Sequence, residues 1–104
     1  MPRIHAVFPV AALAIGAMMV LTAHAEDKIA RSLAATCTGC HGTSGVSQGG
    51  IPSIAGVEKE RILTLLKEFR DGKRPATVMH QHSKGYTDEQ LEAIAGWFAA
   101  QKAK

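Results

Sequence analysis

The 104 residues contain only two cysteines, which excludes a multi-disulfide scaffold and a four-cysteine zinc site. The alternation of polar and apolar residues that is typical of β-strands is missing as well. Charge of one sign does not dominate, since the net charge is only +3. A charge so small and so mixed does not favour nucleic-acid binding. A short chain of this kind is a single domain at most, and it needs a stabilising element beyond its own core.

The N-terminal segment has the layout of a secretory signal peptide. Arg3 supplies a positive charge, residues 6–23 contain no charged side chain, and small residues stand at Ala23 and Ala25. We therefore expect cleavage after Ala25, so that residues 1–25 are removed on export.

Residues 26–104 then form the mature domain, which has 79 residues. An uncleaved anchor helix is the alternative, because 18 uncharged residues approach the roughly 20 that span a bilayer. Pro9 and Gly16 within the stretch, together with its small-residue end, favour removal. The sequence thus predicts a periplasmic protein without stable membrane insertion after cleavage.

Three amphipathic stretches predict an all-α fold. They cover residues 27–36, 57–71 and about 87–101, and two long loops, 42–56 and 72–86, connect them. Asp27 is the expected N-cap of the first helix, and Gly72 is the expected end of the second. Thr87 and Gln90 form a capping-box pattern at the start of the third. The expected apolar faces are Ile29, Ala30, Leu33 and Ala34; Ile62, Leu65, Leu66 and Phe69; and Leu91, Ile94, Ala95 and Phe98.

Both cysteines occur in the run "TCTGCHGTSG", where the spacing is C-x-x-C-H. A structural zinc site needs four ligands, and the mature chain adds only His80 and His82. A thioredoxin-like dithiol should follow a strand, whereas the preceding segment is helical. Covalent haem attachment is the third interpretation and the one we favour. Two thiols about one helical turn apart can reach both vinyl groups of a porphyrin, and the histidine that follows can ligate the iron.

The second axial ligand of such an iron is expected from the loop 72–86. Met79 is the only methionine outside the predicted signal peptide, and a thioether ligand suits electron transfer. Ligation by His80 or His82 is the alternative, and this H-x-H pair could also bind a second metal. Pro52 is either an ordinary loop proline or the residue whose carbonyl orients His41.

These motifs resemble those of class I cytochromes c over the whole mature chain. "CTGCH", "IPSIAG", a methionine loop and an aromatic-containing last helix follow one another in the family's order. The resemblance implies three main helices and long loops wrapped around one haem c. It also implies thioethers at Cys37 and Cys40 and axial ligation by His41 and Met79.

The segments "CTGCHGTSG", "PSIAG", "TVMHQHSKGYTDEQL" and "IAGWFAAQ" are similar to the cytochrome subunit of flavocytochrome c sulfide dehydrogenase. In that family an FAD-bearing flavoprotein oxidises sulfide, and the haem subunit accepts the electrons. The resemblance implies an electron-transfer subunit that is not a catalyst by itself and that passes electrons to a downstream acceptor. The single motif predicts one haem. A free cytochrome that shuttles electrons to a terminal oxidase or reductase is the alternative, and a haem sensor or copper-handling module is a third hypothesis.

Overall fold

The computed structural model describes residue 2 and residues 10–103, and it gives side-chain surroundings for residue 2 and residues 18–103. The helices are α1 (Val10–Ala34), α2 (Thr38–His41), α3 (Lys59–Arg70), α4 (Met79–Lys84) and α5 (Asp88–Ala99), with 3₁₀ turns at Ala35–Cys37 and Thr43–Gly45. Since the described residues contain no β-strand, the all-α prediction is confirmed. No helix among these residues is both long enough and apolar enough to cross a membrane.

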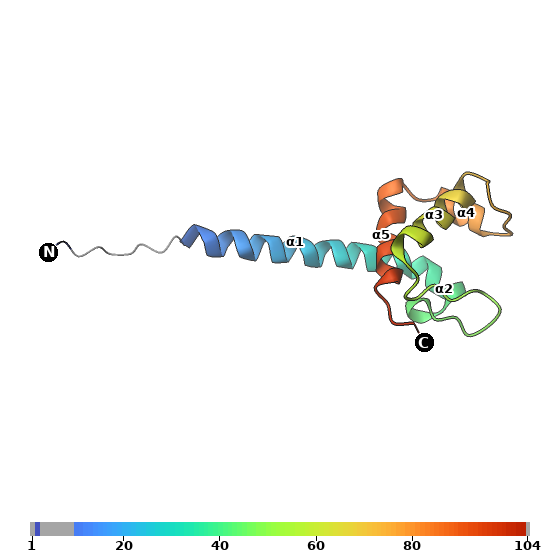
Figure 1. Ribbon diagram of the computed structural model, residues 1–104, viewed down its shortest axis with the longest axis horizontal. Coiled ribbons are helices and arrows are strands. Elements are labelled where there is room, and N and C mark those ends of the chain that lie inside the picture. The colour runs from blue at the N-terminus through green and yellow to red at the C-terminus, as the bar shows by residue number, and fades with distance from the viewer. Residues whose placement is uncertain (1, 3–9, 104) are drawn as a thin grey trace.

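The first helix is much longer than the sequence predicts. It begins at Val10 and passes through Asp27 without a break, so that the prediction of Asp27 as an N-cap is wrong. The stretch before Asp27 is rich in alanine and free of proline from Val10 onward, and such a sequence continues a helix readily. Arg3 and Pro9, on which the signal-peptide prediction partly depends, lie outside the described residues. Figure 1 shows α1 projecting from a head that the other helices form.

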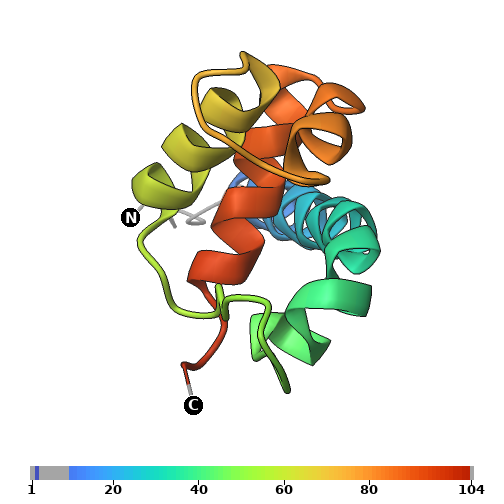
Figure 2. The same cartoon turned by 90° about the vertical axis from the view of Figure 1, so that its right-hand side faces the viewer.

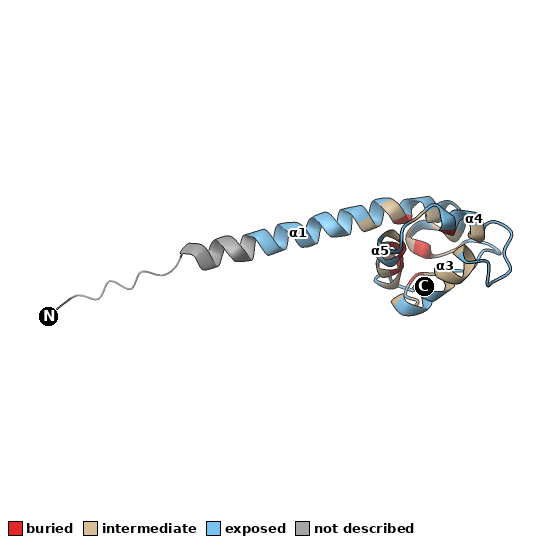
Figure 3. Ribbon diagram, turned by 90° about the horizontal axis from the view of Figure 1, so that it is seen from above, coloured by how far each residue is buried: buried red, intermediate tan, exposed pale blue. Residues whose placement is uncertain are grey.

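Helix α5 is the centre of this head. It packs against both the C-terminal end of α1 and α3, and α4 in turn packs on α3 (Figure 2). The buried residues of the described part lie in the head (Figure 3). The core consists of Ala34, Ala55, Ile62, Leu91, Ile94, Ala95 and Phe98. All four residues predicted for the apolar face of the last helix are therefore buried, and that prediction is confirmed.

The C-terminal end of α3 and the N-terminal end of α5 have the capping geometry that their sequences predict. Gly72 adopts a φ of 71°, and the N–H of Lys73 donates to the carbonyl of Glu68 at 2.9 Å, which completes a Schellman motif. At the start of α5, Thr87 and Gln90 form the reciprocal bonds of a capping box. These local signals explain why the predicted boundaries of both helices agree closely with the structure.

The loop predicted at residues 72–86 contains a helix, α4, that the sequence analysis missed. It has six residues, which is too short for a hydrophobic period to be visible. Only Ser83 of this helix is fully buried, and its Oγ has no hydrogen-bond partner in the described residues. The helix is stabilised by packing on α3 and not by an amphipathic pattern of its own.

Two ion pairs join α3 to α5. One of them should make the stability of the fold depend on pH. The guanidinium of Arg70 bonds to the carboxylate of Asp88 and lowers the pKa of Asp88 below its usual value. A lowered pKa stabilises the fold above the ordinary range of aspartate, and this contribution is lost as pH falls through the folded-state pKa. We expect Arg70→Gln to raise the pKa of Asp88, as measured by NMR titration of its carboxyl group.

The matched control is Lys59→Gln, which removes the other pair, between Lys59 and Glu92 (3.0 Å), and should leave the pKa of Asp88 unchanged. The difference in free energy of unfolding between the wild type and Arg70→Gln should disappear at acidic pH. An ordinary pKa for Asp88 in the wild type would contradict this account.

Candidate cofactor site

Cys37, Cys40 and His41 lie on one nearly continuous helical run. Cys37 ends the first 3₁₀ turn, while Cys40 and His41 belong to α2. The backbone at the junction keeps right-handed helical angles, with φ −84° and ψ −23° at Cys37 and φ −69° and ψ −23° at Thr38. The two thiols therefore belong to positions about one turn apart. Both are free; Cys37 is half-buried, and Cys40 is exposed.

The protonation of Cys37 argues against a redox-active dithiol. Burial raises the pKa of the Cys37 thiol, and a contact with the Thr36 hydroxyl opposes this effect only in part. Reactive dithiols depend on a lowered pKa that supplies thiolate at neutral pH. The environment of Cys37 therefore raises the pKa of its thiol, whereas dithiol chemistry needs a lowered pKa.

His41 and Pro52 come together in the structure. The imidazole Nδ1 lies 2.6 Å from the carbonyl oxygen of Pro52. Because a carbonyl only accepts, Nδ1 carries the hydrogen, and the neutral imidazole keeps its free lone pair on Nε2. A backbone carbonyl in this position fixes the tautomer and the ring orientation of a metal-ligating histidine.

The loop that carries Pro52 is anchored at Gly45. The carbonyl of Gly45 accepts hydrogen bonds from the N–H groups of Ile54 (2.8 Å) and Ala55 (3.1 Å). Gly45 itself has a φ of 82°, and a Cβ there would lie only 2.7 Å from the ring of Phe98. This position thus needs glycine both for its left-handed backbone and for the close approach of the loop to α5.

Met79 is held by a different part of the fold. It is the first residue of α4, is half-buried, and forms no hydrogen bond with the cysteine-containing segment in the described residues. His80 beside it is half-buried, and His82 is exposed. Within the part of the chain that the structure describes, no three metal-binding side chains cluster together. Met79 and His41 therefore belong to different elements, α4 and α2.

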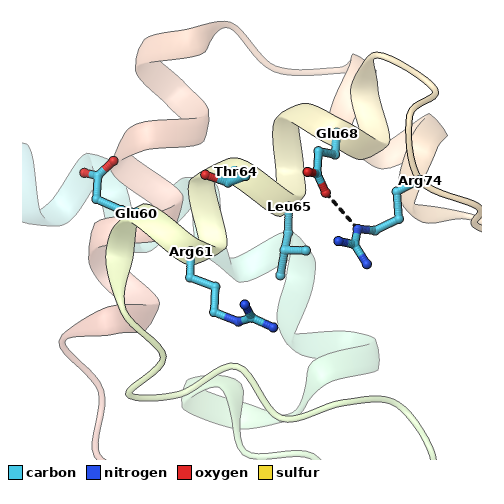
Figure 4. Close-up of a pocket in the computed structure, with 6 residues that line it drawn as sticks. All are labelled: Glu60, Arg61, Thr64, Leu65, Glu68 and Arg74. Carbon is cyan, nitrogen blue, oxygen red and sulfur yellow. Dashed lines mark hydrogen bonds and ion pairs between the residues drawn. The ribbon is translucent and has the colours of Figure 1, made fainter.

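The pocket drawn in Figure 4 lies on α3 and has a volume of about 320 Å³. It is lined by Glu60, Arg61, Thr64, Leu65, Glu68 and Arg74. Arg74 is paired with Glu68 at 2.9 Å, and none of the predicted site residues lines the pocket.

Sequence analysis missed one contact near this site. The hydroxyl oxygens of Tyr86 and Thr36 lie 2.6 Å apart, although 50 positions separate the two residues in the chain. Thr36 directly precedes Cys37, and Tyr86 lies seven positions after Met79. No local pattern signals a pair so distant in sequence.

Comparison with known proteins identifies the family. A family model described as "Cytochrome C oxidase, cbb3-type, subunit III" matches residues 24–98. The chain therefore belongs to this family of class I cytochromes c, whose members carry covalently bound haem c.

Individual relatives are named as cytochromes or as an electron acceptor. The chain is 50% identical over 66 residues to "Cytochrome subunit of sulfide dehydrogenase" from Chlorobaculum tepidum, covering 64% of this chain and 60% of that protein. It is 35% identical over 83 residues to cytochrome c4 from Pseudomonas aeruginosa, covering 77% of this chain and 41% of the relative. It is 36% identical over 69 residues to "Thiosulfate dehydrogenase electron acceptor" from Thiomonas intermedia, covering 62% and 32%. The chain thus spans three fifths or less of the length of these three relatives.

The residues fit haem c. Two free thiols one turn apart, an imidazole with its Nδ1–H already bonded to a carbonyl, and a thioether from another element provide the groups that this cofactor needs. Large apolar side chains also remain uncovered: Ile51 is 45% exposed and Val78 is 51% exposed. An apolar ring system placed among them would remove that surface from water.

We expect Gly45→Ala to destabilise the holoprotein by about 1–3 kcal/mol, because the methyl group meets Phe98 and the residue keeps a left-handed backbone. Denaturant unfolding of the haem-loaded protein measures this loss. Gly49→Ala is the matched control in the same loop, since no heavy atom lies within 4 Å of its Cβ position. Equal stability of the two variants would contradict the role of Gly45 as the anchor.

Proposed function

We propose that this chain is a periplasmic monohaem cytochrome that transfers electrons as the cytochrome subunit of a flavocytochrome c sulfide dehydrogenase. The observation that carries the proposal is the bond of 2.6 Å between His41 Nδ1 and Pro52 O, formed directly after the C-x-x-C motif. This bond presents the remaining imidazole nitrogen as a ligand. Family membership supports the same cofactor.

Each predicted site residue has a separate task in this proposal. Cys37 and Cys40 would form the two thioether bonds, and His41, in the same segment, would ligate the iron. Pro52 holds the imidazole in one orientation through its carbonyl. Met79, the first residue of α4, would supply the second ligand. When bound, haem c supplies an iron that accepts and releases one electron.

The rigid elements around both ligands suit electron transfer. His41 is fixed by a backbone carbonyl in a loop that is itself anchored on Gly45. Met79 begins a helix that packs on α3, and a methionine ligand raises the reduction potential relative to a second histidine. Ligands that stay in place during the redox change need little rearrangement.

The proposed partner is an FAD-containing flavoprotein that oxidises sulfide and transfers the electrons to this subunit. The identity of 50% to the cytochrome subunit of sulfide dehydrogenase from Chlorobaculum tepidum supports this partner. A downstream acceptor then takes the electrons from the cytochrome. Sulfide oxidation itself belongs to the flavoprotein, so the chain acts as the electron-accepting half of the complex.

Export to the periplasm follows from the same proposal. Residues 1–25 act as the signal peptide, and residues 26–104 are the cytochrome domain. The family match begins at residue 24, next to the proposed cleavage point, which is consistent with this division. Covalent attachment of haem c takes place outside the cytoplasm, which agrees with an exported chain.

A free electron shuttle to an oxidase or reductase is the second candidate. It is favoured by the likeness to "Thiosulfate dehydrogenase electron acceptor" from Thiomonas intermedia, at 36% identity. Both candidates use the same haem and ligands. They differ in whether a flavoprotein remains bound.

The ligand assignment is tested by substitution in α4. Met79→Ala should abolish the weak long-wavelength absorption band of ferric haem bound to methionine sulfur, and it should lower the reduction potential. His80→Ala is the control, because it removes an adjacent imidazole from the same helix and should leave both properties intact. Loss of the band in His80→Ala alone would contradict the assignment.

The partner is tested with the mature chain purified from its native periplasm under mild conditions. We expect an FAD-containing protein to co-purify, and sulfide to reduce the haem in the complex faster than in the isolated cytochrome. A cytochrome that is isolated alone, and that no flavoprotein fraction reduces with sulfide, would instead support the free shuttle.

A further inference from the structure

Tyr86 lies at the junction between the segment that carries Met79 and helix α5. The N–H of Gly85 donates to the carbonyl of His82 at 3.2 Å, which closes the end of α4. The capping box of Thr87 begins α5 directly after the tyrosine. Tyr86 is therefore held by ordered backbone on both sides, and its half-buried ring packs against the core.

The hydroxyl of Tyr86 donates to Thr36. Thr36 has a single hydroxyl hydrogen, which it donates to the carbonyl of Leu33 at 3.1 Å. The oxygen of Thr36 must therefore accept in the contact of 2.6 Å with Tyr86. In this way the tyrosine, seven positions after Met79, bonds to the residue next to Cys37.

The bond between Tyr86 and Thr36 links the Met79 segment directly to the cysteine-containing segment. Among the described residues it is the one side-chain hydrogen bond between residues 79–86 and residues 33–41. Helix α4 otherwise packs on α3, which does not belong to the cysteine-containing segment. The position of Met79 relative to Cys37 thus depends on indirect packing together with this single direct bond.

We propose that Tyr86 and Thr36 form a latch that keeps Met79 at a fixed distance from the haem-attachment segment, so that Tyr86 is a positioning residue for the methionine ligand. The inference rests on the proposed ligation by His41 and Met79. If the hydrogen bond is removed, α4 can move away from the attachment segment more easily. An external ligand then competes better with the thioether for the iron.

The test uses the full haem-loaded protein and imidazole as the competing ligand. Tyr86→Phe removes only the hydroxyl and keeps the packed ring. We expect imidazole to bind the ferric protein about two- to tenfold more tightly, the range that one hydrogen bond supplies. The absorption band of methionine-bound ferric haem should also be lost at a lower temperature than in the wild type.

Thr36→Val removes the other partner and should reproduce both effects. The double variant should go no further than either single variant, because all three lack the same bond. Thr38→Val is the matched control: Thr38 also bonds a local carbonyl, that of Ala35 at 2.8 Å, and it has no bond to Tyr86. This control should bind imidazole as the wild type does.

Wild-type imidazole affinity in Tyr86→Phe, additive effects in the double variant, or an equal effect in Thr38→Val would overturn the latch. If Tyr86→Phe fails to fold, the comparison of Thr36→Val with Thr38→Val decides whether the latch exists. Absence of the methionine band in the wild type would instead overturn the ligand assignment, and the latch with it. If only the latch proposal is wrong, the wild type still shows the methionine band.

Discussion

A domain of this size rarely gains much stability from burying its own apolar side chains alone. In the described residues only two large apolar side chains, Phe98 and Leu91, are completely buried. Two other large ones, Ile51 and Val78, remain about half-exposed, one in each long loop. Haem c is an apolar body that would cover such surface if both loops closed on it. In that arrangement the cofactor would extend the hydrophobic core as well as transfer electrons.

The two proposed iron ligands, His41 and Met79, lie in different parts of the head. His41 ends a helical run that continues from α1, whereas Met79 begins α4 and is carried by α3. Helix α5 packs against both α1 and α3, so that it connects the two halves. In the proposed arrangement, a cofactor between the two halves would take one ligand from each of them. Ligands that stay in place would need little rearrangement during the redox change.

Most of this arrangement can be predicted from short-range patterns in the sequence. The capping residues at Gly72 and Thr87 predict the limits of α3 and α5, and the C-x-x-C-H run predicts the cofactor. The start of α1 is not predictable in this way, because no proline separates Val10 from Asp27. The six residues of α4 are too few for a period. The bond between Thr36 and Tyr86 joins positions 50 apart, and only the folded chain brings them together.

The close approach of Gly45 to Phe98 has a consequence for the order of assembly. A chain that is synthesised or exported from its N-terminus presents Cys37, Cys40 and His41 early, whereas Phe98 follows near the end. The loop that sets the imidazole cannot settle on α5 until α5 has emerged. The carbonyl of Pro52, which holds the imidazole of His41, lies in the same loop. The final orientation of that imidazole therefore depends on the last helix of the chain.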